Sequence, residues 1–268
     1  MNQPIKIETI EQYNHLVEHY RRNGSNTNDY LQKEVADLII HHSLYALCGE
    51  DNAVLLVQKA GFYRLYYYIN DFEELVELPK DEYVTEILFR GDNVPEMEVK
   101  WLEKVGFKKN LIRDQYAGRY CDFIKPSKQN SVLIQEASTL EEVKWACELF
   151  NSSFDKWSGD YISSTQYPVL FENGDILIAK DLHGNPLGAT QRELKKGYIK
   201  WAHLAVIISA RGMGVGTSLM DAFIEHNRVD EETRFMMWAQ RQNTTAVKIY
   251  LRKGFKPLNK STLSMIKL

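Results

Sequence analysis

An apolar strand that enters a glycine-rich turn and continues directly as a helix constrains this chain more than any other feature. The strand ends at residues 204–206, and the turn has the pattern Arg-x-x-Gly-x-Gly at Arg211, Gly214 and Gly216. A helix predicted over 215–227 has one apolar face, formed by Val215, Leu219, Met220, Phe223 and Ile224. Its first turn therefore begins at the glycines. The free N–H groups and partial positive charge of that helix end can bind a phosphate or pyrophosphate.

A Rossmann nucleotide site uses similar chemistry, but its glycine pattern follows the first strand of a βαβ unit. An acidic residue then lies about 20 residues downstream, at the tip of the second strand. Here the loop follows several meandering strands and lies late in the chain. This position disfavours a Rossmann site. Taken by itself, a short glycine motif can also serve packing alone.

A second motif lies downstream, where a buried strand at 234–239 leads into another helix. Asn243 is a natural N-cap for this helix and Gly254 a natural stop. Ala246 and Tyr250 lie between them. Each of these residues alone has a structural interpretation, since an Asn often only caps a helix and a Tyr often only packs in a core.

The two motifs together resemble the signatures of the GNAT superfamily of acyl-coenzyme A dependent N-acyltransferases. The first signature is Arg or Gln, two residues, Gly, one residue, then Gly or Ala. It matches Arg211, Gly214 and Gly216, and the second signature matches Asn243, Ala246, Tyr250, Gly254 and Phe255. The chain has Ile208 where the family often has proline.

The resemblance implies that residues 131–268 form a catalytic domain, which transfers an acetyl group from acetyl-CoA to a primary amine of a small molecule or peptide. It implies no metal. Tyr250 would protonate the departing thiolate. The cofactor would contact Leu204, Ala205, Val206, Arg211, Gly212, Met213, Gly214, Val215, Gly216, Asn243 and Ala246. Two alternatives from other classes are an acyl-CoA-binding regulatory protein without catalysis and an interaction protein that uses the fold as a scaffold.

The general base is harder to assign. Family members often place Glu or His two or four residues before the Leu position, where this chain has Ala202 and Lys200. His203 is adjacent, but strand alternation turns it to the other face unless a bulge intervenes. Glu193 is the other candidate for the base, although its carboxylate can equally be a solvated surface charge. A chain of water molecules could instead carry the proton to solvent. Lys200 itself predicts an acidic or amino-acid-like acceptor, although a strand lysine is often only solvated.

The two halves of the chain repeat one pattern, which predicts a mixed α/β fold with two GNAT-like domains in tandem. Each half begins with a helix that has a capping-box signal, at Thr9 in the first half and Thr139 in the second. In both halves a strand, a turn and a second strand follow, and a later helix ends at a Gly-Phe pair. We expect a degenerate domain at 1–125, a linker near residues 125–130, and the catalytic domain after it. In the first half Pro95, Glu98 and Leu102 stand opposite Asn243, Ala246 and Tyr250, and the glycine motif is missing. That half is expected to pack against the active one and shape the acceptor cleft.

The composition limits the classes of partner that the protein is expected to bind. With 33 basic and 36 acidic side chains the formal net charge is -3, which predicts neither nucleic acid nor a membrane as the main partner. The three cysteines are widely spaced and suggest no disulfide framework, and no stretch approaches the roughly 18 apolar residues of a membrane span. A soluble protein of the cytoplasm is expected. The acyl length, the acceptor and the oligomeric state are left open.

Overall fold

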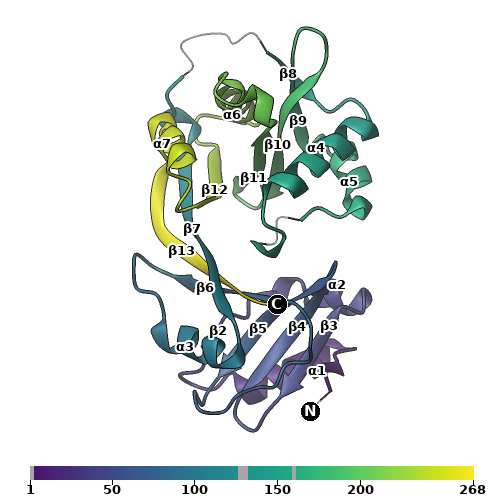
Figure 1. Cartoon of the computed structure of the whole chain (residues 1–268), viewed down its shortest axis with the longest axis vertical. Helices are drawn as coiled ribbons and strands as arrows, with labels where there is room; N and C mark the ends of the chain where they lie inside the picture. The colour runs from purple at the N-terminus through teal and green to yellow at the C-terminus, as the bar shows by residue number, and fades with distance from the viewer. Residues whose placement is uncertain (1–2, 126–131, 159–160) are drawn as a thin grey trace. The chain divides into compact units, whose positions relative to one another are not determined.

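The computed structural model describes residues 3–125, 132–158 and 161–268, which form two compact units (Figure 1). Unit 1 comprises the chain up to Ile112 together with Ser261–Leu268, and unit 2 comprises Arg113–Lys260. The sequence placed the division near residues 125–130, most of which lie outside the described residues. The units divide inside two long strands, β7 (Lys108–Arg119) and β13 (Lys256–Lys267). The second part of β7 pairs with β12 in unit 2, and the second part of β13 pairs with β6 in unit 1.

Unit 1 is a mixed sheet with helices on both faces. Its strands follow the order β1 (Ile5–Lys6), β3 (Leu44–Cys48), β4 (Ala53–Lys59), β5 (Phe62–Ile69), β6 (Tyr83–Phe89) and β13. One face packs against α1 (Ile10–Tyr20) and α2 (Val35–Ile40), and the other packs against α3 (Glu96–Val105). The end of β13 pairs antiparallel with β6, so the last residues of the chain complete this sheet.

In unit 1, other residues of the same unit hydrogen-bond to β5 beyond its short parallel ladder with β6. The parallel ladder between β5 and β6 contains two residue pairs, Tyr63 with Tyr83 and Arg64 with Val84. Beyond it, β2 (Asn26–Thr27) pairs with the end of β5. The buried Asn28 amide then bridges the strands, as its Oδ1 accepts from the Tyr67 N–H at 2.8 Å and its Nδ2 donates to the Glu86 carbonyl at 3.0 Å.

Unit 2 repeats this plan. The strand order is β7, β12 (Arg234–Gln240), β11 (Tyr198–Val206), β10 (Pro186–Lys195), β9 (Ile176–Lys180) and β8 (Leu133–Glu136). Apolar side chains of α4 (Leu140–Ser153) and α5 (Tyr167–Glu172) pack on one face, and those of α6 (Val215–His226) pack on the other. The remaining helix, α7 (Thr244–Lys253), joins β12 to β13.

The local signals in the sequence are borne out, except for the capping box at Thr139. Thr9 caps α1 with a complete capping box, and Gly106 and Gly254 end α3 and α7 in the left-handed conformation, with φ of 104° and 116°. Thr139 caps α4, but the Glu142 carboxylate accepts from the N–H of Ser138, one residue earlier than a capping box requires. Both predicted hairpins form, as β3–β4 and β9–β10. None of the helices in the described ranges is both long and apolar enough to cross a membrane.

Candidate active site

The parallel strands β11 and β12 pair over only three residues. The ladder joins Ile199 to Phe235, Lys200 to Met236 and Trp201 to Met237. After Trp201, β11 continues to Val206 paired with β10 on its other side, while no residue pair with β12 is found in the described chain. Alternate backbone groups of residues 202–206 therefore point away from β10 without a strand to receive them, which suits a ligand that carries amide groups.

The glycine loop lies just past this opening. Gly212 and Gly214 have φ of 79° and 82°, and a Cβ added at either would meet no atom within 4 Å. Helix α6 begins at Val215, with Gly214 at the N-cap and no side chain capping the first turn. The first N–H groups of a helix lack intrahelical partners, so this end offers donors to an anion. The exposed Arg211 fixes the loop to the end of β11, because its Nε donates to the Val206 carbonyl at 3.2 Å.

Gly216 serves differently from the first two glycines. Its φ lies outside the left-handed range, and an added Cβ would lie 3.7 Å from Val206 Cγ2 and 3.8 Å from Leu204 Cδ2. These are ordinary van der Waals contacts, so a small side chain would fit. The neighbours Ile208 and Met213 are exposed, and the proline that the family often has at position 208 is not needed to form the turn here.

Tyr250 lies near the point where β11 and β12 part. Its ring centroid is 6.1 Å from that of Trp201, which forms the last rung of the ladder, and 6.4 Å from that of Phe255. Burial raises the pKa of the phenol above its usual value of 10. Within the described part of the chain, no hydrogen bond to the hydroxyl is found. Asn243 acts as the predicted cap, since its Oδ1 accepts from the Ala246 N–H at 3.2 Å.

A β-bulge decides where His203 points. Gln191 pairs with His203, but the next residue of β10, Arg192, pairs with Trp201, so Ala202 is the extra residue on β11. Trp201 packs in the cluster on the α6 face, whereas His203 stacks on Phe150 of α4, with ring centroids 5.0 Å apart. The bulge thus turns His203 to the same face as Lys200. It also brings the imidazole Nδ1 to 2.7 Å from the Gln191 Oε1.

Glu193 and Lys200 are paired with each other. They stand opposite in the β10–β11 register, and the Lys200 Nζ lies 2.8 Å from Glu193 Oε1, while the Lys195 Nζ lies 2.9 Å from Oε2. Burial opposes ionisation of the Glu193 carboxyl, but the two ammonium groups outweigh it and lower its pKa. Such a carboxylate is a weak acceptor of a further proton.

Gln191 is the residue at this site that the sequence did not indicate. A glutamine in a strand has no motif around it, and its contact with His203 depends on a bulge one residue away. Only the cross-strand register between β10 and β11 could have indicated Gln191, and the sequence does not determine that register.

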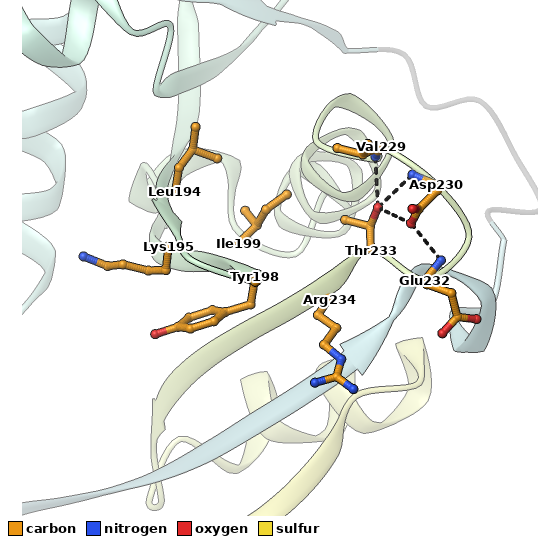
Figure 2. A pocket seen from close by; sticks show the side chains of 10 residues that line it. Leu194, Lys195, Tyr198, Ile199, Val229, Asp230, Glu232, Thr233 and Arg234 are labelled. Carbon is orange, nitrogen blue, oxygen red and sulfur yellow. Dashed lines mark hydrogen bonds between the residues drawn. The ribbon is translucent and has the colours of Figure 1, made fainter.

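A hollow in unit 2 lies near Lys195, at the ends of β10 and β11 that are remote from the glycine loop (Figure 2). It is lined by the end of β10, the start of β11 and the loop that precedes β12, including Tyr198, Ile199 and Arg234. The glycine loop follows the last residues of β11, and β12 runs parallel to β11, so the first residues of both strands lie at the opposite end of the strands from that loop. Thr233 Oγ1 accepts from the Val229 and Asp230 N–H groups at 3.0 and 2.9 Å. These polar groups of the hollow therefore stabilise the loop that precedes β12.

The parting strands, the open glycine loop and the helix behind it belong to a mixed α/β, GNAT-like fold. Residues 172–257 match the family model described as an acetyltransferase (GNAT) domain, and this part of the chain is a GNAT domain. The match covers β9 to the start of β13 and includes both sequence motifs. No curated protein matches the chain.

Solved structures share the fold of the whole chain. An acetyltransferase from the GNAT family of Colwellia psychrerythraea is 12% identical, with all of both chains covered and a TM-score of 0.55. A tandem GNAT protein from the clavulanic acid biosynthesis pathway is 12% identical over 84% of this chain and 82% of its own, with a TM-score of 0.54. A glucosamine N-acetyltransferase region in a fungal multi-domain β-N-acetylglucosaminidase is 12% identical, over 98% of this chain and 38% of that one, with a TM-score of 0.64. The tandem GNAT-like fold expected from the sequence is therefore confirmed.

Proposed function

We propose that the protein is an N-acetyltransferase, which moves an acetyl group from acetyl-CoA to a primary amine of a small molecule or peptide. The observation that carries this proposal is the opening between β11 and β12, which leads directly to an uncapped helix N-terminus inside a GNAT domain. The pyrophosphate would bind the N–H groups of residues 211–216, and the pantetheine arm would bind the backbone of Leu204, Ala205 and Val206. Asn243 and Ala246, at the start of α7, complete the cofactor site in this proposal.

The chemistry follows from the groups around the opening. The amine nitrogen attacks the thioester carbon, while a backbone N–H of residues 204–206 polarises the carbonyl. The carbon–sulfur bond then breaks, and Tyr250 gives its proton to the leaving thiolate. The raised pKa of this phenol keeps it protonated at neutral pH, so it is available as an acid. Solvent returns the proton to Tyr250 after product release.

We assign His203 as the base that takes the proton from the amine. The bulge at Ala202 places its ring on the face of Lys200, where the sequence expected the acceptor. Glu193 is the weaker candidate because its carboxylate is already paired with two ammonium groups and its pKa is lowered. In this proposal Glu193 holds Lys200, and Lys200 exchanges it for a carboxylate of the acceptor. An acidic or amino-acid-like amine is then favoured.

A thiol-release assay tests the activity. Acetyl-CoA is offered with pools of amino acids, polyamines, aminoglycosides, glucosamine and peptides, and free CoA thiol is measured over time. The proposal expects release that depends on one pool. Tight binding of acetyl-CoA without release in any pool would favour the alternative, a regulatory protein that binds acyl-CoA. A protein that binds no acetyl-CoA would favour an interaction scaffold. We place the protein in the reducing cytoplasm.

A further inference from the structure

A guanidinium group lines the hollow at the start of β11 and β12. Arg234 is exposed there, and its side chain makes no ion pair and no hydrogen bond within residues 3–125, 132–158 and 161–268. It stands directly opposite Arg119 in the β7–β12 register, where like charges repel. The charge of Arg119 is offset by Glu232, whose Oε2 lies 2.8 Å from the Arg119 Nη1. Arg234 is therefore suited to a carboxylate that a ligand brings.

Arg234 lies on the face of the sheet that also carries Lys200. Ile199 and Phe235 pair across β11 and β12, and both pack in the cluster on the α6 face. Side chains alternate along a strand, so Lys200 and Arg234, each one residue away from this pair, point to the opposite face. The hollow and the proposed acceptor site are therefore joined along one face of the sheet.

The edge of the sheet is basic on this face. Its cationic side chains are Lys195, Lys200, Arg119 and Arg234, and the carboxylates that pair with them are Glu193 and Glu232. Two positive charges are left over in this set, on a chain whose formal net charge is -3. The Tyr198 side chain also lines the hollow (Figure 2), and its hydroxyl has no hydrogen-bond partner in the described part of the chain. The edge offers donors to an anionic ligand.

The spacing along β11 sets the length of a ligand that reaches both cations. The strands part after Trp201, so the reacting amine of the proposed transfer lies near Ala202. Strand residues rise by about 3.3 Å each, which puts Lys200 about 7 Å and the level of Tyr198 and Arg234 about 13 Å from that point. A free amino acid is too short for this span. An extended peptide has the same rise, so its third and fifth side chains reach these two levels on one side.

We propose that the acceptor is an extended peptide, acetylated at its N-terminal amine, with acidic side chains at its third and fifth residues. Lys200 binds the nearer carboxylate and Arg234 the farther one. The inference rests on the proposed acetyl transfer and adds Arg234 to it as a specificity-determining residue. A guanidinium can bind a carboxylate through two parallel N–H···O bonds, which a neutral amide in the same place cannot match in strength.

The first test measures binding without catalysis. Two N-acetylated, C-terminally amidated peptides, Ala-Ala-Glu-Ala-Glu and Ala-Ala-Glu-Ala-Gln, resemble the product and differ only in the last side chain. Calorimetry with the full chain at low ionic strength should show about 5-fold tighter binding of the first peptide, and a smaller difference at high salt. Arg234→Gln should abolish this preference.

Lys196→Gln is the matched control for the binding test. It removes one positive charge from the turn between β10 and β11, beside the hollow but outside its lining, and should keep the preference of the parent. Equal binding of the two peptides by the parent, or a preference that persists in Arg234→Gln, would overturn the inference.

The second test measures thiol release with the same two peptides carrying free N-termini. Arg234→Gln should raise KM for the more acidic peptide about 5-fold, with kcat and KM for acetyl-CoA unchanged. A parental KM in Arg234→Gln contradicts the role of Arg234 even where transfer proceeds. Binding of the acidic peptide that depends on Arg234, without thiol release from any amine, supports the peptide site but refutes the acetyl transfer, so the two failures are distinguishable.

Discussion

Replacing Gly214 with Asp tests the phosphate loop, because it places a carboxylate at the N-cap of α6 where a pyrophosphate is proposed to bind. At a separation of about 5 Å and an effective dielectric constant of about 20 to 40, two unit charges repel by about 2 to 3 kcal/mol. The carboxylate also competes for the uncapped N–H groups of the first turn. At about 1.4 kcal/mol per decade, repulsion alone weakens acetyl-CoA binding by about 30- to 150-fold.

The fold should survive the change. A Cβ at Gly214 meets no atom within 4 Å, so the cost is the left-handed backbone, φ 82°, which is about 1 to 2 kcal/mol for a residue with a side chain. Gly184, in the β9–β10 turn of the same unit, is a matched control, with φ 84° and equally open space. Gly184→Asp adds the same charge and the same backbone strain far along the chain from the loop.

Isothermal calorimetry with acetyl-CoA and thermal unfolding measure the two effects separately. We expect both variants to lose similar stability, and only Gly214→Asp to lose affinity. A folded Gly214→Asp protein with parental affinity would refute the phosphate-loop assignment. Equal loss of affinity in Gly184→Asp would show that the effect comes from net charge or strain.

Three further predictions follow from the same site. Tyr250→Phe should lower turnover by about 10- to 1000-fold while leaving folding and acetyl-CoA affinity nearly unchanged, since it deletes only the hydroxyl; parental turnover with the true acceptor would make Tyr250 a packing residue. Calorimetric titration should give one acetyl-CoA per chain, because in unit 1 the Asn28 amide bridges the strands where unit 2 is open, and two equivalent sites would contradict this. The folded-state pKa of Glu193 is lowered from 4.5, so its contribution to stability is present above that pH and is lost as the pH falls through the folded pKa. Melting temperatures of the parent and Glu193→Gln should therefore differ at neutral pH and converge in acid, and a constant difference across the range would show that the carboxylate charge plays no part.

The sequence alone determined the features that depend on near neighbours in the chain. Helical periodicity fixed α6 behind the glycines, the Thr9 and Asn243 side chains predicted two helix starts, and Gly254 predicted a helix end. Each of these depends on residues within four positions of one another, so the pattern is visible before any tertiary contact forms. The spacing of the two glycine-bearing motifs was enough to indicate a GNAT domain, which the match at residues 172–257 bears out.

Tertiary structure decided which of these elements meet, and in which register. The second part of β7 pairs with β12 in unit 2, and the second part of β13 pairs with β6 in unit 1. Strand partners are chosen by burial and hydrogen bonding across the whole chain, which no local pattern records. One extra residue, Ala202, turns His203 from one face of β11 to the other, and the same register brings Gln191 to its ring and Glu193 to Lys200. Side chains in a strand alternate with period two, so a shift of one residue reverses every assignment of a face. The sequence named His203 as a candidate, but the face on which its ring lies and its contact with Gln191 could not be predicted from the sequence.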